Sequence, residues 1–325
     1  MTSGAGRVLG GRYTLLTPIA QGGMGEVWKA RDRVSGHIVA AKVLRPELAG
    51  EELSLSRLRL EARNSMSISH PNIANTQDSG EEDGIGWIIM ELVDGYPLTD
   101  YLRGGSRIEP EYLMPILVQV AMALGAAARA GVVHRDIKPG NIMLDSYKAP
   151  VLTDFGVSAR IGEGAGGSVD GFSVLWAPPE QHDGNSVAEP SQDVWALASS
   201  LWTLLVGRSP FEDPIGDNTT VAVAMRVRSG RLRGVARADV PEELDEVLRA
   251  AMSVDPTRRT RSALAFAQSL QGIQRLAGLP VTPIEVRDAP HMPRPSVPGP
   301  ASPAGFPVPV PSQGEGTRPR GASAA

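Results

Sequence analysis

The hydrophobic pattern of this chain changes near residue 109, and this change limits its fold more than any other feature. Before residue 109, short apolar runs alternate with Gly-rich or polar turns, which is typical of strands. The strands are expected at residues 13–19, 27–31, 37–44 and 87–93, with one charged, Leu- and Arg-rich helix at 51–68 among them. After residue 109, apolar side chains recur at helical spacing, with helices expected at 112–130, 193–206, 222–229, 242–253 and 262–276. A small strand-rich part and a larger helical part predict an α+β fold of two lobes that meet at a cleft.

Proline divides the chain a second time. Twelve of the 27 prolines lie between Pro280 and Ala325, together with many Gly, Ser and Ala residues. Such a segment buries too little apolar surface to offset the entropy of ordering it, so we expect a disordered tail with local polyproline II structure. The predicted organisation is a short leader at 1–11, one domain at 12–276 with lobes at about 12–92 and 93–276, and a tail at 277–325.

The expected tail allows two interpretations. A solvated, featureless segment is the simpler one. The alternative is a ligand for a proline-binding partner, since the stretch from Pro290 to Pro293 has PxxP spacing, although chance produces this spacing in any proline-rich tract.

Composition excludes several classes of function. A net charge of −4 argues against nucleic-acid binding, which normally requires a basic surface. The absence of cysteine removes disulfides and thiolate chemistry and fits a reducing compartment. No N-terminal signal is visible, and no stretch has the ~18 apolar residues of a transmembrane segment, since Pro115, Gln119, Arg129 and Gly131 interrupt the longest candidate, 114–133. We therefore expect a cytoplasmic protein.

A Gly-rich string, Ile19-Ala-Gln-Gly22-Gly23-Met-Gly25-Glu-Val27, joins the first two expected strands. Without Cβ atoms, glycines let backbone N–H groups approach phosphate oxygens closely. A plain Gly-rich turn is the commoner meaning of such a string, so it is weak evidence alone. Its position in a hairpin, rather than between a strand and a helix, argues against a dinucleotide fold or a Walker loop.

Lysine is rare in this chain. Only four of the 32 basic residues are lysines, namely Lys29, Lys42, Lys138 and Lys148. Because the chain uses Arg at its other basic positions, the few lysines that it keeps indicate positions where an ammonium group is needed. Lys42 lies inside an apolar strand, where burial is costly unless an anion receives its charge. Glu61, in the middle of the expected helix, is the natural counter-ion that would orient Lys42 toward a phosphate, and a Lys that extends from an edge strand into solvent is the alternative.

Two polar loops carry the strongest chemical signal. The string His134-Arg-Asp136-Ile-Lys138-Pro-Gly-Asn141 offers a carboxylate base, a cation for a transferring phosphoryl group and an oxygen ligand for a metal. Asp154 follows an apolar run and begins the string Asp-Phe-Gly. Its carboxylate can be a second oxygen ligand for Mg²⁺, which favours carboxylates together with substrate phosphates.

Taken in order, these features resemble the signature set of protein kinases. The resemblance extends over about residues 13–276 and is greatest to the eukaryotic-like Ser/Thr kinases of bacteria, of the actinobacterial type, which share the strings at Arg12-Tyr13, Gly22–Val27 and His70–Ile73. It implies a bilobal kinase fold, with a small antiparallel-sheet N-lobe that includes helix C and a larger, mainly helical C-lobe. It also implies ATP and Mg²⁺ as cofactors and proteins as substrates.

The resemblance assigns roles to the matching residues. Asp136 would accept or orient the proton of the substrate hydroxyl, and Lys138 would neutralise the γ-phosphoryl group. Lys42, paired with Glu61, would hold the α- and β-phosphates, while Asn141 and Asp154 would hold Mg²⁺. The residues expected around the nucleotide are Ile19, Gly22, Gly23, Gly25, Val27, Ala40, Lys42, Glu91, Val93 and Met143, with Met90 at the back of the pocket.

Structural and regulatory roles follow from the same resemblance. They are implied for Arg135, Phe155, Gly156, Ser168, Ser173, Glu180, Asp193 and Arg259. Asp193 would brace the catalytic loop, and Arg259 would pair with Glu180. The Asp-x-Lys form of the loop, with Ser173 where the family usually has a Thr that touches Lys138 and Asp136, indicates Ser/Thr substrates.

Four positions depart from the family pattern. Ala20, Phe172 and Ala198 stand where the family usually has Gly, and Pro178 stands where it has Ala. We expect Ala20 to weaken ATP binding without abolishing it, because Gly22 and Gly25 allow the closest backbone approach. Ala198 is a mild change that suits a helix interior.

The segment between Gly156 and Trp176 contains no Thr or Tyr. Related kinases are activated by phosphorylation of threonines there, and the phosphate pairs with the Arg before the catalytic Asp, here Arg135. Our hypothesis is that Ser168 is the regulatory site, or that Glu163 or Asp170 orders the segment without a phosphate.

Three functions compete. An active protein kinase is favoured, because Lys42, Glu61, Asp136, Asn141 and Asp154 are all present, whereas pseudokinases usually lack at least one. A pseudokinase that binds ATP as a scaffold is the first alternative. A small-molecule kinase of the aminoglycoside type is the second, but such enzymes lack the Gly-rich loop and the Asp-Phe-Gly string seen here. A tail-binding partner and a homodimer are further expectations.

Overall fold

The structure of the chain is a computed structural model that describes residues 4–22, 25–103, 107–156, 158–160, 162, 174–183 and 186–285. Residues up to Arg287 form one compact unit. The unit that starts at Asp288 lies outside the described residues, as does most of the predicted tail.

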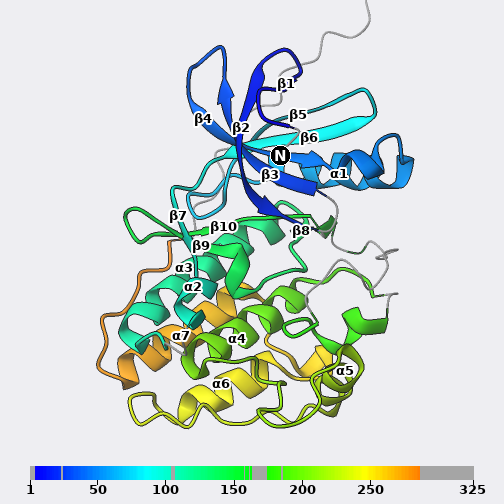
Figure 1. Ribbon diagram of the computed structural model, residues 1–325. Coiled ribbons are helices and arrows are strands. Elements are labelled where there is room, and N and C mark those ends of the chain that lie inside the picture. Colours follow the sequence, from blue (N-terminus) through cyan, green and yellow to red (C-terminus); the bar gives the residue numbers. More distant parts are fainter. Residues whose placement is uncertain are drawn as a thin grey trace, which may run out of the picture. The chain divides into compact units, whose positions relative to one another are not determined.

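The N-terminal lobe is built on one antiparallel sheet of six strands (Figure 1). The strands lie in the order β1 (Val8–Leu9), β2 (Tyr13–Gln21), β3 (Gly25–Asp32), β4 (Ile38–Leu44), β6 (Ile85–Glu91) and β5 (Thr76–Glu82). Helix α1 (Glu52–Met66) packs on β5 and β6 through Leu55 and Leu58, which meet Leu44 and Ile88 of the sheet. The short helix η1 (Pro46–Leu48) connects β4 to α1.

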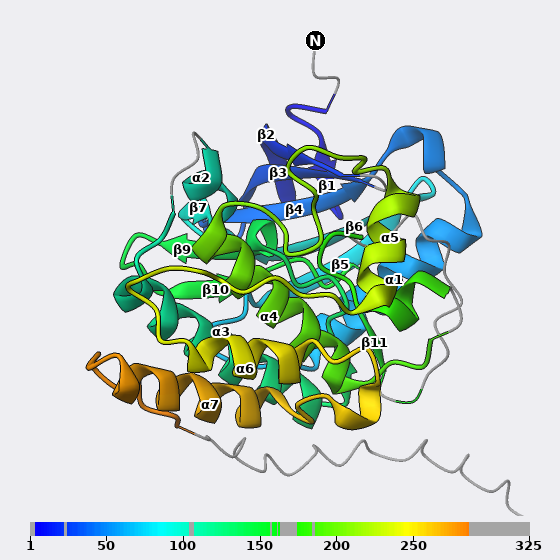
Figure 2. The ribbon, with the colours of Figure 1, turned by 90° about the horizontal axis from the view of Figure 1, so that it is seen from below.

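The C-terminal lobe is mainly helical, as expected. Its helices are α2 (Thr99–Leu102), α3 (Pro110–Arg129), α4 (Pro190–Val206), α5 (Thr220–Ser229), α6 (Glu243–Ala251) and α7 (Ala263–Leu276), with short helices η3 (Pro139–Asn141), η5 (Pro179–Asp183) and η6 (Pro256–Arg258). Helices α6 and α7 pack side by side, and α7 also packs on α3 (Figure 2). The core around α3 and α4 includes the buried Trp195 and Trp202.

Short strands at the top of this lobe position the polar loops. Strands β7 (Gly95–Pro97), β9 (Ile142–Asp145) and β10 (Pro150–Leu152) form one sheet, and β8 (Val132–Val133) pairs with β11 (Ala159–Arg160). The two loops with the strongest chemical signal follow β8 and β10, so the strand pairing brings them to the same end of the lobe.

The predicted α+β architecture is confirmed, and the predicted strands and long helices form close to their expected bounds. Strand β5 was missed because its sequence, Thr-Gln-Asp-Ser-Gly-Glu-Glu, has no apolar alternation. It forms as the edge partner of β6, and the Tyr13 hydroxyl donates a 2.8 Å hydrogen bond to Asp78 within it. Ordered structure also extends past the predicted boundaries, since β1 pairs with β2 before residue 12 and the Gln274 side chain bonds to Thr282 after residue 276.

Helix α3 corrects the expectation that no segment is long and apolar enough to cross a membrane. Among the described residues it meets that criterion by length and composition alone. However, 61% of its apolar window is buried inside the protein, where it packs against α4 and α7. The helix is therefore accounted for as the central core helix of this lobe.

Gly95 allows a close approach between β7 and β9. A Cβ atom built at this position would overlap the backbone carbonyl of Leu144, which cannot move without breaking the sheet. We expect Gly95→Ala to lower the free energy of unfolding by about 2 kcal/mol or more, as measured by urea denaturation. The matched control is Gly272→Ala in helix α7, where a Cβ meets nothing within 4 Å. Gly272→Ala should raise the free energy of unfolding by about 0.5–1 kcal/mol. A Gly95→Ala variant that is as stable as the wild type, or more stable, would contradict the packing argument.

Candidate active site

Lys42 on β4 contacts two carboxylates, one from each lobe. Its Nζ atom lies 2.7 Å from Glu61 Oε1 on α1 and 2.9 Å from Asp154 Oδ1 in the loop after β10. The side chains of Lys42 and Glu61 are 14% and 4% exposed, whereas that of Asp154 is 47% exposed. The expected counter-ion pair is thus present, and Lys42 is not a lysine that extends into solvent.

The charges of this triad explain its pKa values. Burial would lower the pKa of Lys42, but Glu61 and Asp154 outweigh burial and raise that pKa above its ordinary value. Burial raises the pKa of Glu61 against the opposing charge of Lys42. The charge of Lys42 is the main reason that the pKa of Asp154 falls to about 2. Lys42 is therefore a cation and Asp154 a carboxylate at neutral pH, as a phosphate and metal site requires.

Replacing Lys42 by Met should raise the pKa of Asp154 back toward its ordinary value of 3.8, because the largest charge that lowers it is removed. In the wild type the depressed pKa means that ionised Asp154 stabilises the fold above about pH 4, and that this contribution is lost as the pH falls toward 2. NMR of ¹³C-labelled aspartate should show no titration of Asp154 between about pH 3.5 and 8 in the wild type and a titration inside this window in the variant.

Two further variants complete this measurement. Asp154→Asn assigns the resonance, and Lys29→Met removes an exposed lysine of the neighbouring strand β3 as a control. An Asp154 that titrates identically in Lys42→Met and in the wild type would contradict the electrostatic argument.

The loop after β8 gathers the second group of charges. Lys138 Nζ lies 2.7 Å from Asp136 Oδ2, and Asn141 Nδ2 donates to the Asp136 carbonyl at 2.8 Å and to its Oδ2 at 3.1 Å. Asp136 and Asn141 are 7% and 6% exposed, so the three side chains hold one another in place. With the amide nitrogen of Asn141 engaged in this way, its side-chain oxygen is the atom suited to a metal.

The two loops are fixed to each other through backbone bonds. The Thr153 N–H donates to the Asn141 carbonyl at 2.9 Å, which places Asp154 next to the loop that carries Asp136. The rings of Phe155 and His134 lie 4.4 Å apart, and both residues are buried. Among the described residues no three His, Asp or Glu side chains form a metal cluster. The oxygens of Asn141 and Asp154 nevertheless fit Mg²⁺, whose other ligands are normally waters and phosphate oxygens.

Asp193, at the start of α4, braces the loop from below. Its two carboxylate oxygens accept the N–H groups of His134 at 2.9 Å and Arg135 at 2.8 Å. Arg135 has a φ of 68°, and Asp154 has a φ of 61°, in the left-handed region that non-Gly residues rarely adopt. Backbone strain of this kind persists only where the surroundings enforce it. The bond from the Arg135 N–H to Asp193 supplies that constraint at Arg135.

Arg259 and Glu180 also meet as expected. The guanidinium donates to both Glu180 carboxylate oxygens, at 2.7 and 3.0 Å, and the Arg259 side chain is fully buried. Next to Glu180, the Gln181 side chain donates to the Arg135 carbonyl at 3.3 Å. Sequence reasoning missed this contact, which links the pair to the loop that carries Asp136.

Most of the described residues expected around the nucleotide lie on strands of the two lobes. Val27 on β3 pairs with Lys42 on β4, Ala40 pairs with Met90 on β6, and Met143 lies on β9 of the other lobe. Ile19 is 45% exposed on β2.

Two backbone positions of the nucleotide set are more constrained. A Cβ atom on Gly25 would lie 2.6 Å from the Val43 carbonyl oxygen, so this position requires glycine, and the Gly22 N–H bonds to the Gly25 carbonyl at 2.8 Å. The Glu91 N–H donates to the Asn75 carbonyl at 2.8 Å, and the roles predicted for Glu91 and Val93 at the purine edge stay predictions.

Several predicted residues lie outside the described residues. They are Gly23, Phe172, Ser168 and Ser173, together with Glu163 and Asp170. Of the four lysines, Lys42 and Lys138 are in the site. Lys148 instead donates to the Tyr96 hydroxyl at 2.5 Å and lies 4.7 Å from the centre of its ring, and Lys29 is exposed.

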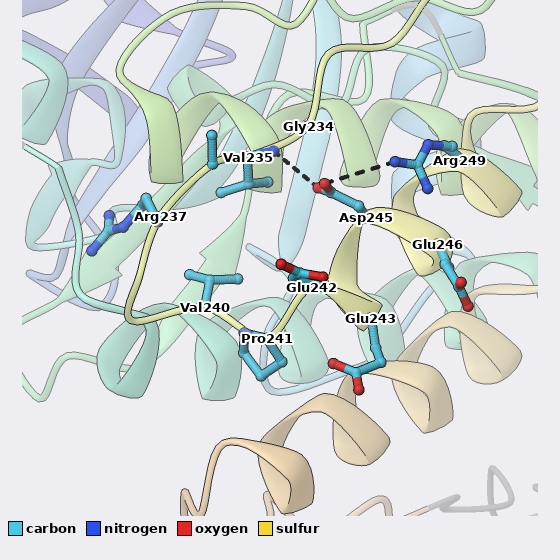
Figure 3. A pocket seen from close by; sticks show the side chains of 11 residues that line it. Gly234, Val235, Arg237, Val240, Pro241, Glu242, Glu243, Asp245, Glu246 and Arg249 are labelled. Atoms are coloured by element: carbon cyan, nitrogen blue, oxygen red, sulfur yellow. Dashed lines mark hydrogen bonds and ion pairs between the residues drawn. The ribbon is translucent and has the colours of Figure 1, made fainter.

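A separate hollow of about 640 Å³ lies between the segment 234–241 and helix α6 (Figure 3). Its wall includes Asp245, which accepts a 2.9 Å bond from the Val235 N–H and lies 3.8 Å from Arg249. None of the predicted site residues lines it. The hollow therefore lies within the C-terminal lobe and is separate from the charged site formed by Lys42, Asp136 and Asp154.

Comparison with known proteins agrees with this geometry. Residues 13–270 match the protein kinase domain family. The chain belongs to the protein kinase family. The kinase is 34% identical over 263 residues to the serine/threonine-protein kinase PrkC of Bacillus subtilis, and 33% identical over 318 residues to the serine/threonine-protein kinase PknA of Mycobacterium tuberculosis. It is 33% identical over 271 residues to the serine/threonine-protein kinase PknB of Mycolicibacterium smegmatis.

The relatives differ in how much of their length the kinase spans. The aligned part covers 79% of this chain but 40% of PrkC, 94% of this chain and 69% of PknA, and 81% of this chain but 43% of PknB. The relatives place this kinase among the eukaryotic-like serine/threonine kinases of bacteria, and the resemblance noted from its motifs is confirmed.

Proposed function

We propose that this kinase transfers the γ-phosphoryl group of ATP to serine and threonine hydroxyls of protein substrates in a signalling role. The observation that carries the proposal is the position of Lys42 Nζ, within 2.7 Å of Glu61 and 2.9 Å of Asp154. This arrangement joins strand β4, whose Lys42 would hold the phosphates, to the metal-binding loop, that is, the loop after β10 whose Asp154 would hold Mg²⁺. Phosphoryl transfer depends almost entirely on positioning and charge stabilisation, and all the required charges are assembled here.

The proposed step uses the residues of both loops. The substrate hydroxyl oxygen attacks the γ-phosphorus in line, the bond to the β-phosphate oxygen breaks, and ADP leaves. The hydroxyl proton passes to Asp136, and Lys138 neutralises charge on the transferring group. Asn141 and Asp154 would hold Mg²⁺, which when bound screens the charge of the phosphate oxygens. Lys42, fixed by Glu61, would hold the α- and β-phosphates, and the strand residues around Val27, Ala40 and Met143 would enclose the adenine.

The choice of Ser and Thr rests on the Asp-x-Lys form at Asp136 and Lys138, on Ser173 and on the names of the relatives. The test is incubation of the purified kinase with γ-labelled ATP, Mg²⁺ and a generic protein substrate, followed by phosphoamino-acid analysis. Phosphoserine and phosphothreonine are expected. No incorporation would favour the pseudokinase alternative, and phosphotyrosine alone would refute the substrate class.

The proposal extends to regulation and to partners. We infer that Ser168 is the regulatory position and that the segment from Pro280 recruits substrates or partners, because the chain offers no Thr or Tyr between Gly156 and Trp176 and is proline-rich at its end. Phosphopeptide mapping of Ser168→Ala tests the first inference. Deletion of the tail tests the second, since it should spare activity on a generic peptide and impair it on a native substrate. We further propose that the kinase acts in the cytoplasm, where ATP is available. We also propose that it forms a homodimer.

A further inference from the structure

A buried amide joins helix α1 to the segment that follows Asp154. The Asn64 Nδ2 atom donates to Ser158 Oγ at 3.3 Å and to the Ser158 carbonyl at 3.4 Å. Asn64 is fully buried and Ser158 is 7% exposed. The Ser158 N–H in turn donates to the Phe155 carbonyl at 3.0 Å, so Ser158 is fixed to the metal-binding loop. The proposed transfer step uses neither Asn64 nor Ser158.

The contact joins the same two segments as the Lys42 triad. Asn64 lies one helical turn after Glu61, so both side chains project from one face of α1. Ser158 lies four residues after Asp154. The lobes are therefore linked twice, once by charges at Lys42 and once by the neutral contact of Asn64 with Ser158.

This neutral contact contributes little to the stability of the fold. Both of its hydrogen bonds are longer than the usual N–H···O distance, and Asn64 Oδ1 is buried without a partner among the described residues. A buried polar atom without a partner disfavours folding, and an apolar side chain of similar size would avoid that cost. A weak polar contact has a different advantage, because it is directional and easily broken and re-formed.

We propose that Asn64 and Ser158 are positioning residues that hold α1 in the arrangement in which Glu61 reaches Lys42. The inference rests on the proposed function of the Lys42 site. A contact of this strength changes the equilibrium constant between the assembled and displaced arrangements of α1 about three- to tenfold. The apparent affinity for ATP with Mg²⁺ falls in proportion to the fraction of molecules in the competent arrangement, whereas saturating ATP restores that arrangement. Loss of the contact therefore raises KM for ATP and leaves kcat nearly unchanged.

The experiment compares Asn64→Ala, Ser158→Ala and the double variant. Asn64→Ala removes both hydrogen bonds, and Ser158→Ala removes only the one to the hydroxyl. Calorimetric titration with ATP and Mg²⁺ should show Kd raised by Asn64→Ala, with about three- to tenfold as the upper limit, less by Ser158→Ala, and no further in the double variant. KM for ATP should follow Kd, with kcat within about twofold of the wild type.

Two more variants separate positioning from a general loss of structure. Ser56→Ala removes the hydroxyl of an exposed serine on α1, which donates to the Leu53 carbonyl of the same helix, and it should leave Kd unchanged. Asn64→Leu should fold as stably as the wild type and still raise Kd. In the ligand-free kinase, amide hydrogen exchange within 52–66 should be faster in Asn64→Ala and Asn64→Leu than in the wild type.

The outcomes are distinct. Additive effects in the double variant, an unchanged Kd in Asn64→Leu, or a fall in kcat with Kd unchanged would each overturn the positioning role. Calorimetry and hydrogen exchange need no phosphoryl transfer. A wild type that binds ATP but transfers nothing would therefore refute the proposed function alone, whereas an active wild type with unaffected variants would refute this inference alone.

Discussion

Asp136→Asn is expected to reduce phosphoryl transfer by about 10²- to 10⁴-fold, because an amide cannot accept the proton of the substrate hydroxyl. The substitution keeps the size of the side chain and one oxygen for Lys138, whose Nζ lies 2.7 Å from the wild-type carboxylate. Lys42, Asn141 and Asp154 are unchanged, so binding of ATP with Mg²⁺ should stay within a few-fold of the wild type. Transfer is measured with γ-labelled ATP and binding by calorimetry on the same preparation.

The matched control is Asp83→Asn. Asp83 is exposed in the turn between β5 and β6 and has a φ of 53°, a conformation that Asn also tolerates. This variant should transfer phosphate at the wild-type rate. Equal incorporation by Asp136→Asn and the wild type would remove Asp136 from the proposed step, and a parallel loss of ATP binding would make its role structural.

The charged residues of the site were predictable because the chemistry restricts residue type and spacing. Asp136, Lys138 and Asn141 lie within six residues of one another, so their sequence alone implies that they meet, and the structure has them in contact. Lys42 and Asp154 are 112 residues apart. Composition and the apolar strand around it indicated that Lys42 needed an anion, and Glu61 was predicted as that counter-ion, but the contact of Lys42 with Asp154 was not predicted.

Two other features of the structure could not be predicted from the sequence: the contact of Asn64 with Ser158 and strand β5. The contact of Asn64 with Ser158 spans 94 residues and involves two small polar side chains that occur in any loop or helix. Its only hint is that Asn64 follows Glu61 by three residues on the same helix face. Strand β5 was missed for the opposite reason, since its polar sequence adopts a strand only because β6 offers it an edge. Tertiary pairing decides such segments, and local pattern does not.

Glu180→Gln is expected to lower the free energy of unfolding by about 3 kcal/mol, because it leaves the charge of Arg259 buried without its counter-ion. The Arg259 guanidinium also donates to the carbonyls of Ser191 and Ser253 and lies 5.1 Å from the centre of the Trp195 ring. One buried cation thus joins η5, the start of α4 and the loop before η6. The effect is measured by urea denaturation, followed by tryptophan fluorescence.

Two comparisons isolate the buried charge as the cause. Glu52→Gln removes one carboxylate from an ion pair with Arg59 in which both side chains are at least half exposed, and it should change stability by no more than about 0.5 kcal/mol. The double variant Glu180→Gln with Arg259→Met should lose less than the sum of the two single variants, because no unpaired charge remains. A loss below about 1 kcal/mol in Glu180→Gln would show that solvent reaches Arg259. In that case the pair would not fix the segment whose Gln181 contacts Arg135 beside Asp136.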